Sequence, residues 1–344
     1  CYEKELTFFG FMRELLGRTI FVTEGEVNKK RRIALTSIFH YDFIRPFLPE
    51  MVGIVNKTYN QIEEKGLNNV EILKEVANIS GETIVTLFMG ASVLEKRYKG
   101  ETMPNFLRIM FTNIGVSMKS PWVFFFGAGM CKKMGLFKEL SEDIQGVRKL
   151  FLDFVKEKKK DYIARGRIPK HEIIETLWKH LEENPCKEYT EEDVDDEYLG
   201  FLLGGLANST HFMQMMFYFM ALYPDVVEKL REESKRIYGN GSNLTMDDLH
   251  RMDYTQAFIK ETIRMGTPVP MIVPRVALKD HILGDVRVKK DTLVTVDLYG
   301  RNLDKNAFEN PTEFRPERWL GAEGLKDPFS YIPFSAGYMG CIGQ

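Results

Sequence analysis

The sequence predicts a mainly helical protein with a small antiparallel β-sheet near its carboxyl end, which is an α+β fold. Two observations carry this prediction. Before Pro268, apolar residues recur at three- and four-residue spacing, as they do on one face of an amphipathic helix. After Pro268, positions 272–299 alternate apolar and polar residues in short runs around Gly284-Asp285, and this pattern predicts antiparallel strands.

Helix positions follow from the apolar spacing and from residues typical of helix ends. Pro224 favours the start of one helix, and Thr245 with Asp248 three residues later matches a capping box at the start of another. A long helix is expected to end at Gly166. The segments predicted to be helical are 1–20, 25–40, two or three helices within 46–100, 136–166, and the helices that follow Asp195, Pro224 and Thr245.

Two apolar stretches allow more than one interpretation. Residues 200–223 carry no formally charged side chain and are long enough to span a membrane. Their polar residues, and the acidic residues 195–197 just before them, favour a buried helix instead. Residues 121–127 read Pro-Trp-Val-Phe-Phe-Phe-Gly, which is typical of a buried turn; a membrane-dipping or ligand-gating loop is the alternative.

Composition and charge exclude several classes of protein. Apolar residues make up 44% of the 344 residues, enough for a large core, and the formal net charge is −2. No excess of positive charge points to nucleic acid as a partner. The four cysteines (Cys1, Cys131, Cys186 and Cys341) are far apart and form no CxxC pair, so neither a zinc site nor a disulfide framework is expected. A reducing compartment fits this pattern.

Three motifs follow one another in the last quarter of the chain: residues 261–264 (Glu-Thr-Ile-Arg), 314–319 (Phe-Arg-Pro-Glu-Arg-Trp) and 334–343, which include Cys341. Taken singly, they are typical of a solvated ion pair, a charged loop and a buried structural thiol. In the third motif, however, glycines let the loop turn back and bring backbone N–H groups toward the sulfur, which stabilises a thiolate. One thiolate is too few ligands for structural zinc, but it suits a haem iron, whose equatorial ligands come from the porphyrin.

These motifs, ExxR, PERW and FxxGxxxCxG in this order, resemble the cytochrome P-450 family of the eukaryotic microsomal type. The resemblance covers nearly the whole chain. Residues 27–31 stand where the family has WxxxR, residues 203–210 where its central helix carries the oxygen-activation motif, and residues 270–275 at the strand after ExxR. It implies the P-450 fold and one catalytic domain over 1–344, without the amino-terminal anchor and sheet and without the helix that follows the cysteine.

The resemblance implies how the cofactor, haem, is held. Cys341 would be the axial ligand of the iron, and its electron donation would favour O–O cleavage. Gly337 and Gly343 would shape the loop around the cysteine, and Phe334 would pack near the sulfur.

The resemblance also assigns five charged residues. Glu261, Arg264 and Arg318 would form a buried structural triad, and breaking it would leave an unpaired buried charge at a cost of roughly 3–5 kcal/mol. Arg275 and Arg31 would bind the haem propionates, since the guanidinium fork matches a carboxylate.

The chain departs from the family pattern at several positions. Met339 and Val27 replace two residues that usually contact a propionate. In the central helix, Ala207 stands at the position of the acid and Asn208 at that of the threonine, with Ser209 next; a frame shifted by one residue would put Asn208 at the acid and make Ser209 and Thr210 the hydroxyls. In either frame Asn208, Ser209 and Thr210 are the catalytic candidates and could hold a water, or they could only satisfy a helix kink.

The expected function is that of a haem-thiolate monooxygenase, which inserts one atom of O2 into a small apolar organic substrate. Electrons would come from NADPH through a flavoprotein reductase, so NADPH and flavin are cofactors of the partner only. The basic cluster Lys29, Lys30, Arg31 and Arg32 would dock that reductase, or would be a solvated helix face. The expected location is the cytosolic face of the endoplasmic reticulum membrane, with attachment through the missing anchor.

Three alternatives remain open from the sequence. The missing acid and threonine would suit a haem-thiolate isomerase or dehydratase that acts on a peroxide. A chain that ends just after Cys341 and has Met339 could be a non-catalytic truncated fragment. A membrane protein that spans at 200–223 would need no haem.

Overall fold

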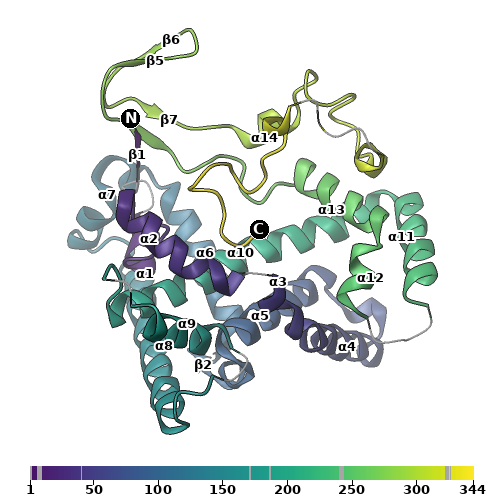
Figure 1. Cartoon of the computed structure of the whole chain (residues 1–344), viewed down its shortest axis with the longest axis horizontal. Coiled ribbons are helices and arrows are strands. Elements are labelled where there is room, and N and C mark those ends of the chain that lie inside the picture. The colour runs from purple at the N-terminus through teal and green to yellow at the C-terminus, as the bar shows by residue number, and fades with distance from the viewer. Residues whose placement is uncertain are drawn as a thin grey trace. The chain divides into compact units, whose positions relative to one another are not determined.

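The computed structural model of the chain describes residues 2–5, 10–39, 41–169, 172–185, 187–239, 244–321, 325 and 327–344. Cys1 and Cys186, two of the four cysteines, lie outside the described residues. The chain forms two compact units, each assembled from three separate segments (Figure 1). Unit 1 comprises Cys1–His40, Ile84–Ala207 and Val273–Thr295; unit 2 comprises Tyr41–Thr83, Asn208–Ile272 and Val296–Gln344. A single catalytic domain over 1–344 stays a prediction.

Unit 1 contains most of the strands and the longest amphipathic helix. Its helices are α1 (Gly10–Leu16), α2 (Gly25–Thr36), α6 (Met103–Met118), α7 (Pro121–Lys133), α8 (Lys138–Ala164) and α9 (Ile173–Glu183). Its strands are β1 (Tyr2–Lys4), β2 (Arg97–Tyr98), β3 (Glu101–Thr102), β4 (Arg275–Ala277), β5 (His281–Leu283), β6 (Val286–Val288) and β7 (Leu293–Val294). Two helices run through both units: α5 (Ile72–Met89) and α10 (Glu191–Leu222).

The antiparallel strands predicted after Pro268 are confirmed. β4 lies between β1 and β7, and β5 and β6 form a separate hairpin that projects beyond β7 in Figure 1. Gly284, in the predicted turn, has φ +62°, a left-handed conformation that favours glycine. The prediction of one helix over 1–20 is wrong in part, because Tyr2–Lys4 pairs with β4 as a strand and, of the residues in this range that the structure describes, Gly10–Leu16 form the helix.

The core of unit 1 brings α10 very close to the segment that follows α1. A Cβ placed on Gly200 would lie 2.6 Å from Thr19 Cγ2, and one placed on Gly17 would lie 2.2 Å from Asp196 Oδ2. Glycine is therefore needed at both positions for α10 to approach. Around this contact α10 buries one apolar face: Tyr198, Leu199, Phe201, Leu202, Leu203 and Leu206.

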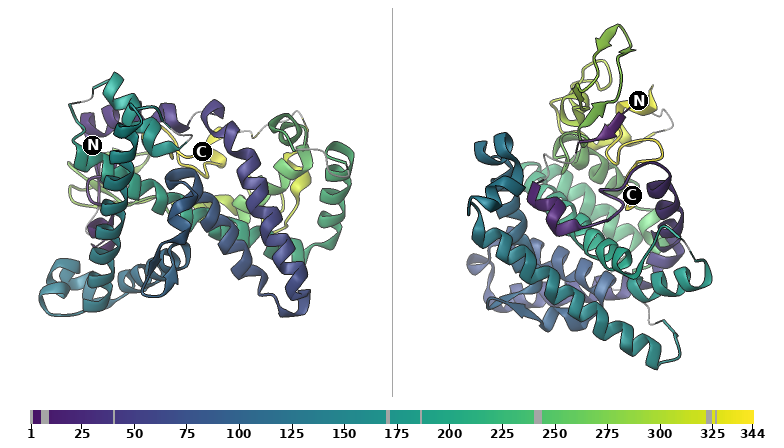
Figure 2. Two further views of the ribbon diagram at one scale, coloured as in Figure 1. Left: turned by 90° about the horizontal axis from the view of Figure 1, so that it is seen from below. Right: turned by 90° about the vertical axis from the view of Figure 1, so that its left-hand side faces the viewer.

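Unit 2 is mainly helical. It contains α3 (Tyr41–Ile44), α4 (Leu48–Lys65), α11 (Pro224–Ile237), α12 (Met246–His250), α13 (Asp253–Met265) and α14 (Leu298–Asn302). Its short 3-10 helices include η3 (Arg45–Phe47), η4 (Leu67–Asn69), η6 (Pro316–Trp319) and η7 (Pro328–Ser330). α4 and the first part of α5 form a helical hairpin (Figure 2), with Lys65 of one paired to Glu75 of the other at 3.0 Å. The predicted start at Pro224 and the capping box of Thr245 and Asp248 are both confirmed.

Aromatic residues from three segments form the core of unit 2. The rings of Phe219 and Phe314 stack with centroids 4.4 Å apart, and Phe258 meets Phe314 edge-on at 5.9 Å. Glu233 of α11 accepts hydrogen bonds from the backbone N–H groups of Tyr254 (2.7 Å) and Thr255 (2.8 Å), which lie in the first turn of α13. These contacts fix the start of α13, the helix that carries the ExxR motif.

The apolar segment 200–223 lies within α10. Across the part of the chain that the structure describes, no helix combines the length and apolar character needed to cross a membrane. The transmembrane interpretation of this segment therefore finds no support in the described helices.

Candidate functional site

The loop before Cys341 turns back on itself through backbone hydrogen bonds. The Cys341 N–H donates to Phe334 O at 2.7 Å, and the Gly340 N–H donates to Gly337 O at 3.0 Å. Gly337 has φ +76° and Ser335 has φ +64°, so two residues of this turn take a left-handed conformation. The turn fixes Cys341 directly beside Phe334 in space, although seven positions separate them in the chain.

The thiol of Cys341 is free and exposed to solvent. Gly343 leaves room next to it, since a Cβ there would lie 4.0 Å from Sγ, an ordinary van der Waals distance. The Phe334 ring is 39% exposed, so it borders the sulfur loop rather than filling a core. Among the described residues no group of three His, Cys, Asp or Glu could hold a metal ion.

Glu261 of α13 is a buried carboxylate that accepts five hydrogen bonds. Arg264 donates to it from Nε and Nη2 at 2.9 and 2.8 Å, and Arg318 donates from Nε at 2.9 Å. The Arg315 backbone N–H (2.9 Å) and Trp319 Nε1 (2.8 Å) supply the other two. Burial raises the pKa of Glu261, but the bonds from Arg264 and Arg315 outweigh it and hold the pKa below its usual range. The carboxylate is therefore ionised and fully paired at neutral pH.

This cluster ties α13 to the segment that leads to the cysteine loop. Arg264 Nη1 donates to Asn302 O at 2.8 Å, and Asn302 Nδ2 donates back to Arg264 O at 3.0 Å. Tyr331 Oη donates to Lys260 O at 3.1 Å, and its ring lies 4.6 Å from that of Trp319. The predicted Glu261, Arg264 and Arg318 thus lie together. Trp319 was missed as a partner, although its place in the PERW segment could have indicated it.

Arg275, in unit 1, lies on the central strand of the three-stranded sheet. It pairs with Lys4 of β1 on one side and Val294 of β7 on the other, and its Nη1 donates to Val273 O at 2.8 Å. Lys4 Nζ donates to the carbonyls of residues 20, 21 and 23 at 2.8–3.2 Å. Burial lowers the pKa of Lys4 to about 8; Glu24 opposes this, while Arg275 and Arg32 lower it further. Positive charge is therefore concentrated around this strand.

Arg31, predicted as a second propionate ligand, is buried and engaged by the protein. Its Nε and Nη2 donate to Glu188 O at 3.0 and 2.7 Å, its Nη1 donates to Arg18 O, and its Nη2 lies 2.9 Å from Asp193 Oδ1. Its guanidinium also lies 4.7 Å from the centre of the Tyr189 ring. A propionate would have to displace these partners. The propionate role of Arg31 stays a prediction that its contacts in this structure do not favour.

Sequence reasoning did not predict that Arg32, the next residue, lies near Lys4 together with Arg275. It is half-buried, and it is near enough to Lys4 to lower that pKa. Consecutive residues of a helix point about 100° apart, so a one-residue offset decides which arginine faces inward. The spacing of WxxxR also fits Asn28 to Arg32, and without the tryptophan the sequence does not settle the frame.

The central-helix candidates do not face the same way. Thr210 is buried and its Oγ1 donates to Ser80 Oγ of α5 at 3.0 Å. Asn208 and Ala207 are exposed, and Ser209 is half-buried. Thr210 thus closes a buried polar pair inside unit 2, which leaves Asn208 as the polar candidate on the open face of α10.

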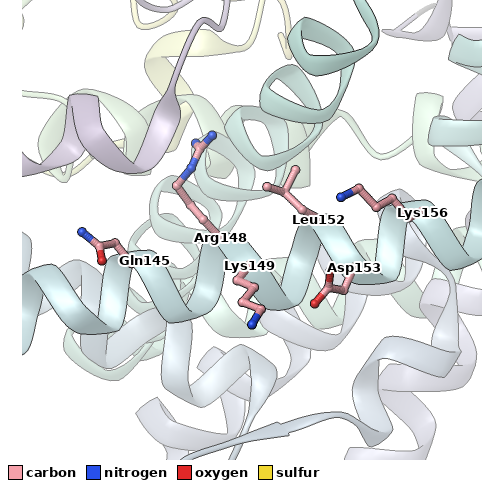
Figure 3. Close-up of a pocket in the computed structure, with 6 residues that line it drawn as sticks. All are labelled: Gln145, Arg148, Lys149, Leu152, Asp153 and Lys156. Atoms are coloured by element: carbon pink, nitrogen blue, oxygen red, sulfur yellow. The ribbon is translucent and has the colours of Figure 1, made fainter.

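A shallow hollow of about 390 Å³ lies along α8, lined by Gln145, Arg148, Lys149, Leu152, Asp153 and Lys156 (Figure 3). All six residues belong to one helix. Arg148, Leu152 and Lys156 point to one side of it and Lys149 and Asp153 to the other, so the hollow is part of an open helix surface. None of the predicted site residues lines it.

Comparison with known proteins settles the family. A family model described as cytochrome P450 matches residues 4–344. The chain belongs to the cytochrome P450 family. Mouse cytochrome P450 4V2 is 28% identical over 98% of this chain, and human cytochrome P450 2U1 is 29% identical over 65%. A structure described as retinoic acid-bound cyanobacterial CYP120A1 superposes with a TM-score of 0.75 at 22% identity, covers 99% of this chain and 73% of the other, and confirms the fold.

The P450 chain described here matches 66% of the length of the mouse relative and 40% of the human one. Family and fold imply haem as the cofactor. The residues present fit it: an exposed, free thiol on a glycine-containing loop can give the iron its single protein ligand, and the porphyrin supplies the rest.

Proposed function

We propose that the chain is the catalytic part of a haem-thiolate monooxygenase, which inserts one atom of O2 into an apolar organic substrate with electrons from a partner reductase. The observation that carries this proposal is the exposed thiol of Cys341, on a loop whose preceding segment is held by the buried cluster around Glu261. Bound haem would supply the activation of O2, with electron donation from the thiolate favouring O–O cleavage.

The remaining work belongs to the protein's own residues. The Glu261 cluster holds the segment before the cysteine loop, so that Sγ stays in one place. Arg275 orients a carboxylate through its guanidinium. On the open face of α10, the Asn208 amide can orient a water but cannot give up a proton itself, and Ala207 offers no acid. In this proposal the Asn208 amide would hold a water that carries protons along the open face of α10.

The deciding test is the reduced, CO-bound difference spectrum of the haem-loaded protein, with Cys341→Ser as the variant. Cys131→Ser is the matched control, because Cys131 is the other described cysteine and is fully buried. We expect a strongly red-shifted Soret band in the wild type and in Cys131→Ser, but not in Cys341→Ser. Bound haem with the same unshifted band in all three proteins would remove Cys341 as the ligand, and absence of haem binding would favour the non-catalytic fragment.

One observation favours a second function, that of a haem-thiolate isomerase or dehydratase acting on a peroxide. In the preferred frame of the central-helix motif, residues 204–209, α10 carries neither a carboxylate nor a threonine, and such a reaction needs no delivered protons. Turnover of an organic hydroperoxide without NADPH or reductase would support it. Substrate oxidation that requires NADPH, reductase and O2 would support the monooxygenase.

The proposed electron donor is a flavoprotein reductase, and the proposed location is the cytosolic face of the endoplasmic reticulum membrane. Support for the reductase comes from the basic middle of α2, where Lys29 is exposed and Lys30 pairs with Glu188 at 2.5 Å. Reversing the charge of Lys29 and Lys30 should slow reduction and weaken its dependence on salt. Unchanged reduction kinetics would argue against docking at this face, and recovery outside the microsomal fraction would argue against the location.

A further inference from the structure

Side chains from other elements of unit 1 hold the segment that joins α1 to α2, residues 17–24. Lys4 of β1 donates from Nζ to the carbonyls of residues 20, 21 and 23 at 2.8–3.2 Å. Asn28 of α2 donates from Nδ2 to the carbonyls of residues 20 and 23 at 2.7 and 3.0 Å. Arg31, also of α2, donates to the carbonyl of Arg18. We call residues 17–24 the α1–α2 segment.

The long helix α10 supplies further contacts to the α1–α2 segment. Asp196 accepts a hydrogen bond from the backbone N–H of Arg18 at 2.8 Å, and Arg148 of α8 pairs with its other carboxylate oxygen. The backbone N–H of Ile20 is close enough to Glu197 to lower the pKa of that carboxyl. Side chains of β1, α2 and α10 therefore satisfy backbone groups that no regular helix or strand pairs in this segment.

The Glu197 side chain is buried and poorly compensated. Its Oε1 lies 3.8 Å from Arg31 Nη1 and accepts from Tyr189 Oη at 3.3 Å, whereas its Oε2 makes no hydrogen bond to any described residue. Arg31 lies closer to Asp193, at 2.9 Å. An ionised Glu197 would place a second buried carboxylate on one arginine, so the neutral form is favoured. Burial raises the pKa of Glu197 to about 8, against the contributions of Ile20, Arg31 and Tyr189.

We propose that the α1–α2 segment is a latch that opens with the release of a proton from Glu197. While the segment is closed, the neutral carboxyl lies buried beside Ile20. When the segment moves away, water reaches Glu197 and the carboxyl ionises, so a rise in pH through the neutral range favours the open state. This device goes beyond the proposed function, because Lys4 and Glu197 take no part in the haem chemistry described above.

Lys4 responds to pH in the opposite sense. Burial lowers its pKa to about 8, with Arg275 and Arg32 lowering it further and Glu24 and Glu197 raising it. Opening would take Nζ from its three carbonyls into water, where its pKa is 10.5. Between these values the closed segment holds a neutral Lys4 and the open one a charged Lys4, so a further rise in pH favours closing. At neutral pH Lys4 is charged in both states, and Glu197 alone responds.

The two groups together predict that opening is greatest near pH 8. As the pH rises from 4.5 to 8, the equilibrium constant for opening should increase by up to about tenfold per pH unit, because only the open state has ionised Glu197. From pH 8 to 10.5 it should decrease by up to about tenfold per unit, because only the open state keeps Lys4 charged. A segment held by backbone hydrogen bonds alone would show no such maximum.

Hydrogen–deuterium exchange of the full chain, followed by mass spectrometry between about pH 5.5 and 9.5, tests the proposal. Each rate is divided by the intrinsic exchange rate at that pH, so that the ratio reports opening. We expect the ratio for residues 18–23 to peak near pH 8. The connection between α7 and α8 is the internal control: Gly135 N–H donates to Lys132 O at 3.0 Å and Leu136 N–H to Cys131 O at 2.9 Å, and its ratio should stay constant.

Matched variants assign each side of the maximum to one group. Glu197→Gln keeps the shape of the side chain but cannot ionise, so the increase below pH 8 should disappear. Glu192→Gln changes an exposed acid of the same helix and should leave the profile intact. Lys4→Met should increase opening at neutral pH, because three hydrogen bonds are lost, and should remove the decrease above pH 8. Lys289→Met, at an exposed lysine of unit 1, should do neither.

Three results would overturn the proposal: a flat profile in the wild type, an increase below pH 8 that survives in Glu197→Gln, and the same maximum in the control connection. Urea unfolding at each pH separates local opening from global unfolding. If the segment exchanges with the free energy of global unfolding throughout, there is no latch. Should Glu197→Gln fail to fold, the wild-type maximum and its change in Lys4→Met still decide the matter.

Discussion

Replacing Arg31 or its neighbour Arg32 of α2 by methionine should lower the free energy of unfolding by very different amounts. Methionine keeps a long apolar stem and removes the charge. Arg31 has no exposed surface, and both it and its counter-ion Asp193 are about 1% exposed at the side chain. Removing the buried partner of Asp193 leaves it only the mostly exposed Arg18 at 3.2 Å, so Arg31→Met should lower the free energy of unfolding by about 3 kcal/mol, the lower end of the cost of breaking a buried pair.

The state of the neighbouring acids sets which charge is left behind. Burial raises the pKa of Glu197 to about 8, so this residue is protonated at neutral pH. Burial also acts on Asp193, but hydrogen bonds from Thr190 and Arg31 outweigh it and lower the pKa. Arg31 therefore balances Asp193, and Arg31→Met leaves that buried carboxylate with the mostly exposed Arg18, whose Nε lies 3.2 Å away, in place of its buried cation.

Arg32 is the matched control, because it has the same chemistry one position along the same helix. It is only half-buried, and water screens its charge, so Arg32→Met should cost about 1 kcal/mol or less. The assay is urea unfolding followed by circular dichroism, with Arg31→Lys as an intermediate variant that keeps the charge and loses the fork. Equal losses for Arg31→Met and Arg32→Met, or no loss for Arg31→Met, would refute the reasoning.

Three further predictions concern other buried groups. Glu261→Gln should lower the free energy of unfolding by about 3 kcal/mol or more, because Arg264 loses its buried counter-ion; urea unfolding measures it, and a loss below about 1 kcal/mol would count against the cluster. Glu197 keeps its proton in the folded state up to about pH 8 but releases it near pH 4.5 when unfolded. The free energy of unfolding should therefore fall as the pH rises from 4.5 to 8, by up to about 1.4 kcal/mol per pH unit. Glu197→Gln should flatten that part of the pH profile, and an unchanged profile would contradict the assignment. Gly17→Ala should be more destabilising in thermal unfolding than Gly135→Ala: both glycines have positive φ, but only at Gly17 would the new Cβ meet Asp196 at 2.2 Å, and equal shifts would show that this contact does not matter.

Order and spacing of motifs were enough to predict the fold and the cluster around Glu261. Glu261 and Arg264 are three residues apart on one helix face, whereas Arg318 lies 57 residues from Glu261, and its place in the cluster followed from the family resemblance of the ordered motifs. The strands after Pro268 followed from their alternation. In these cases local pattern and tertiary contact agree, which is why sequence reasoning succeeded.

Side-chain positions that depend on tertiary packing could not be predicted from the sequence. Arg31 and Arg32 differ only in the side of α2 that they occupy, and nothing local distinguishes them. Residues 121–127, predicted to be a buried turn, begin α7 instead, and packing of Val123 and Ala128 on α1 holds their aromatic rings outward. The hydrogen bond from Thr210 to Ser80 joins residues 130 positions apart, so local sequence could not indicate it; the catalytic role of Thr210 stays a prediction.

The links between α13 and the segment before the cysteine loop also bear on the order in which unit 2 can fold. The hydrogen bonds that Arg315 donates to Glu261 and Tyr331 donates to Lys260 close loops of 54 and 71 residues, whereas the hydrogen bond from Thr210 to Ser80 closes one of 130. The entropy cost of closing a loop grows with its length, so the Glu261 cluster can form before the distant segments of unit 2 are gathered. The segment before Cys341 would then be one of the first parts of this unit to fold, and the other helices of unit 2 would pack against it later.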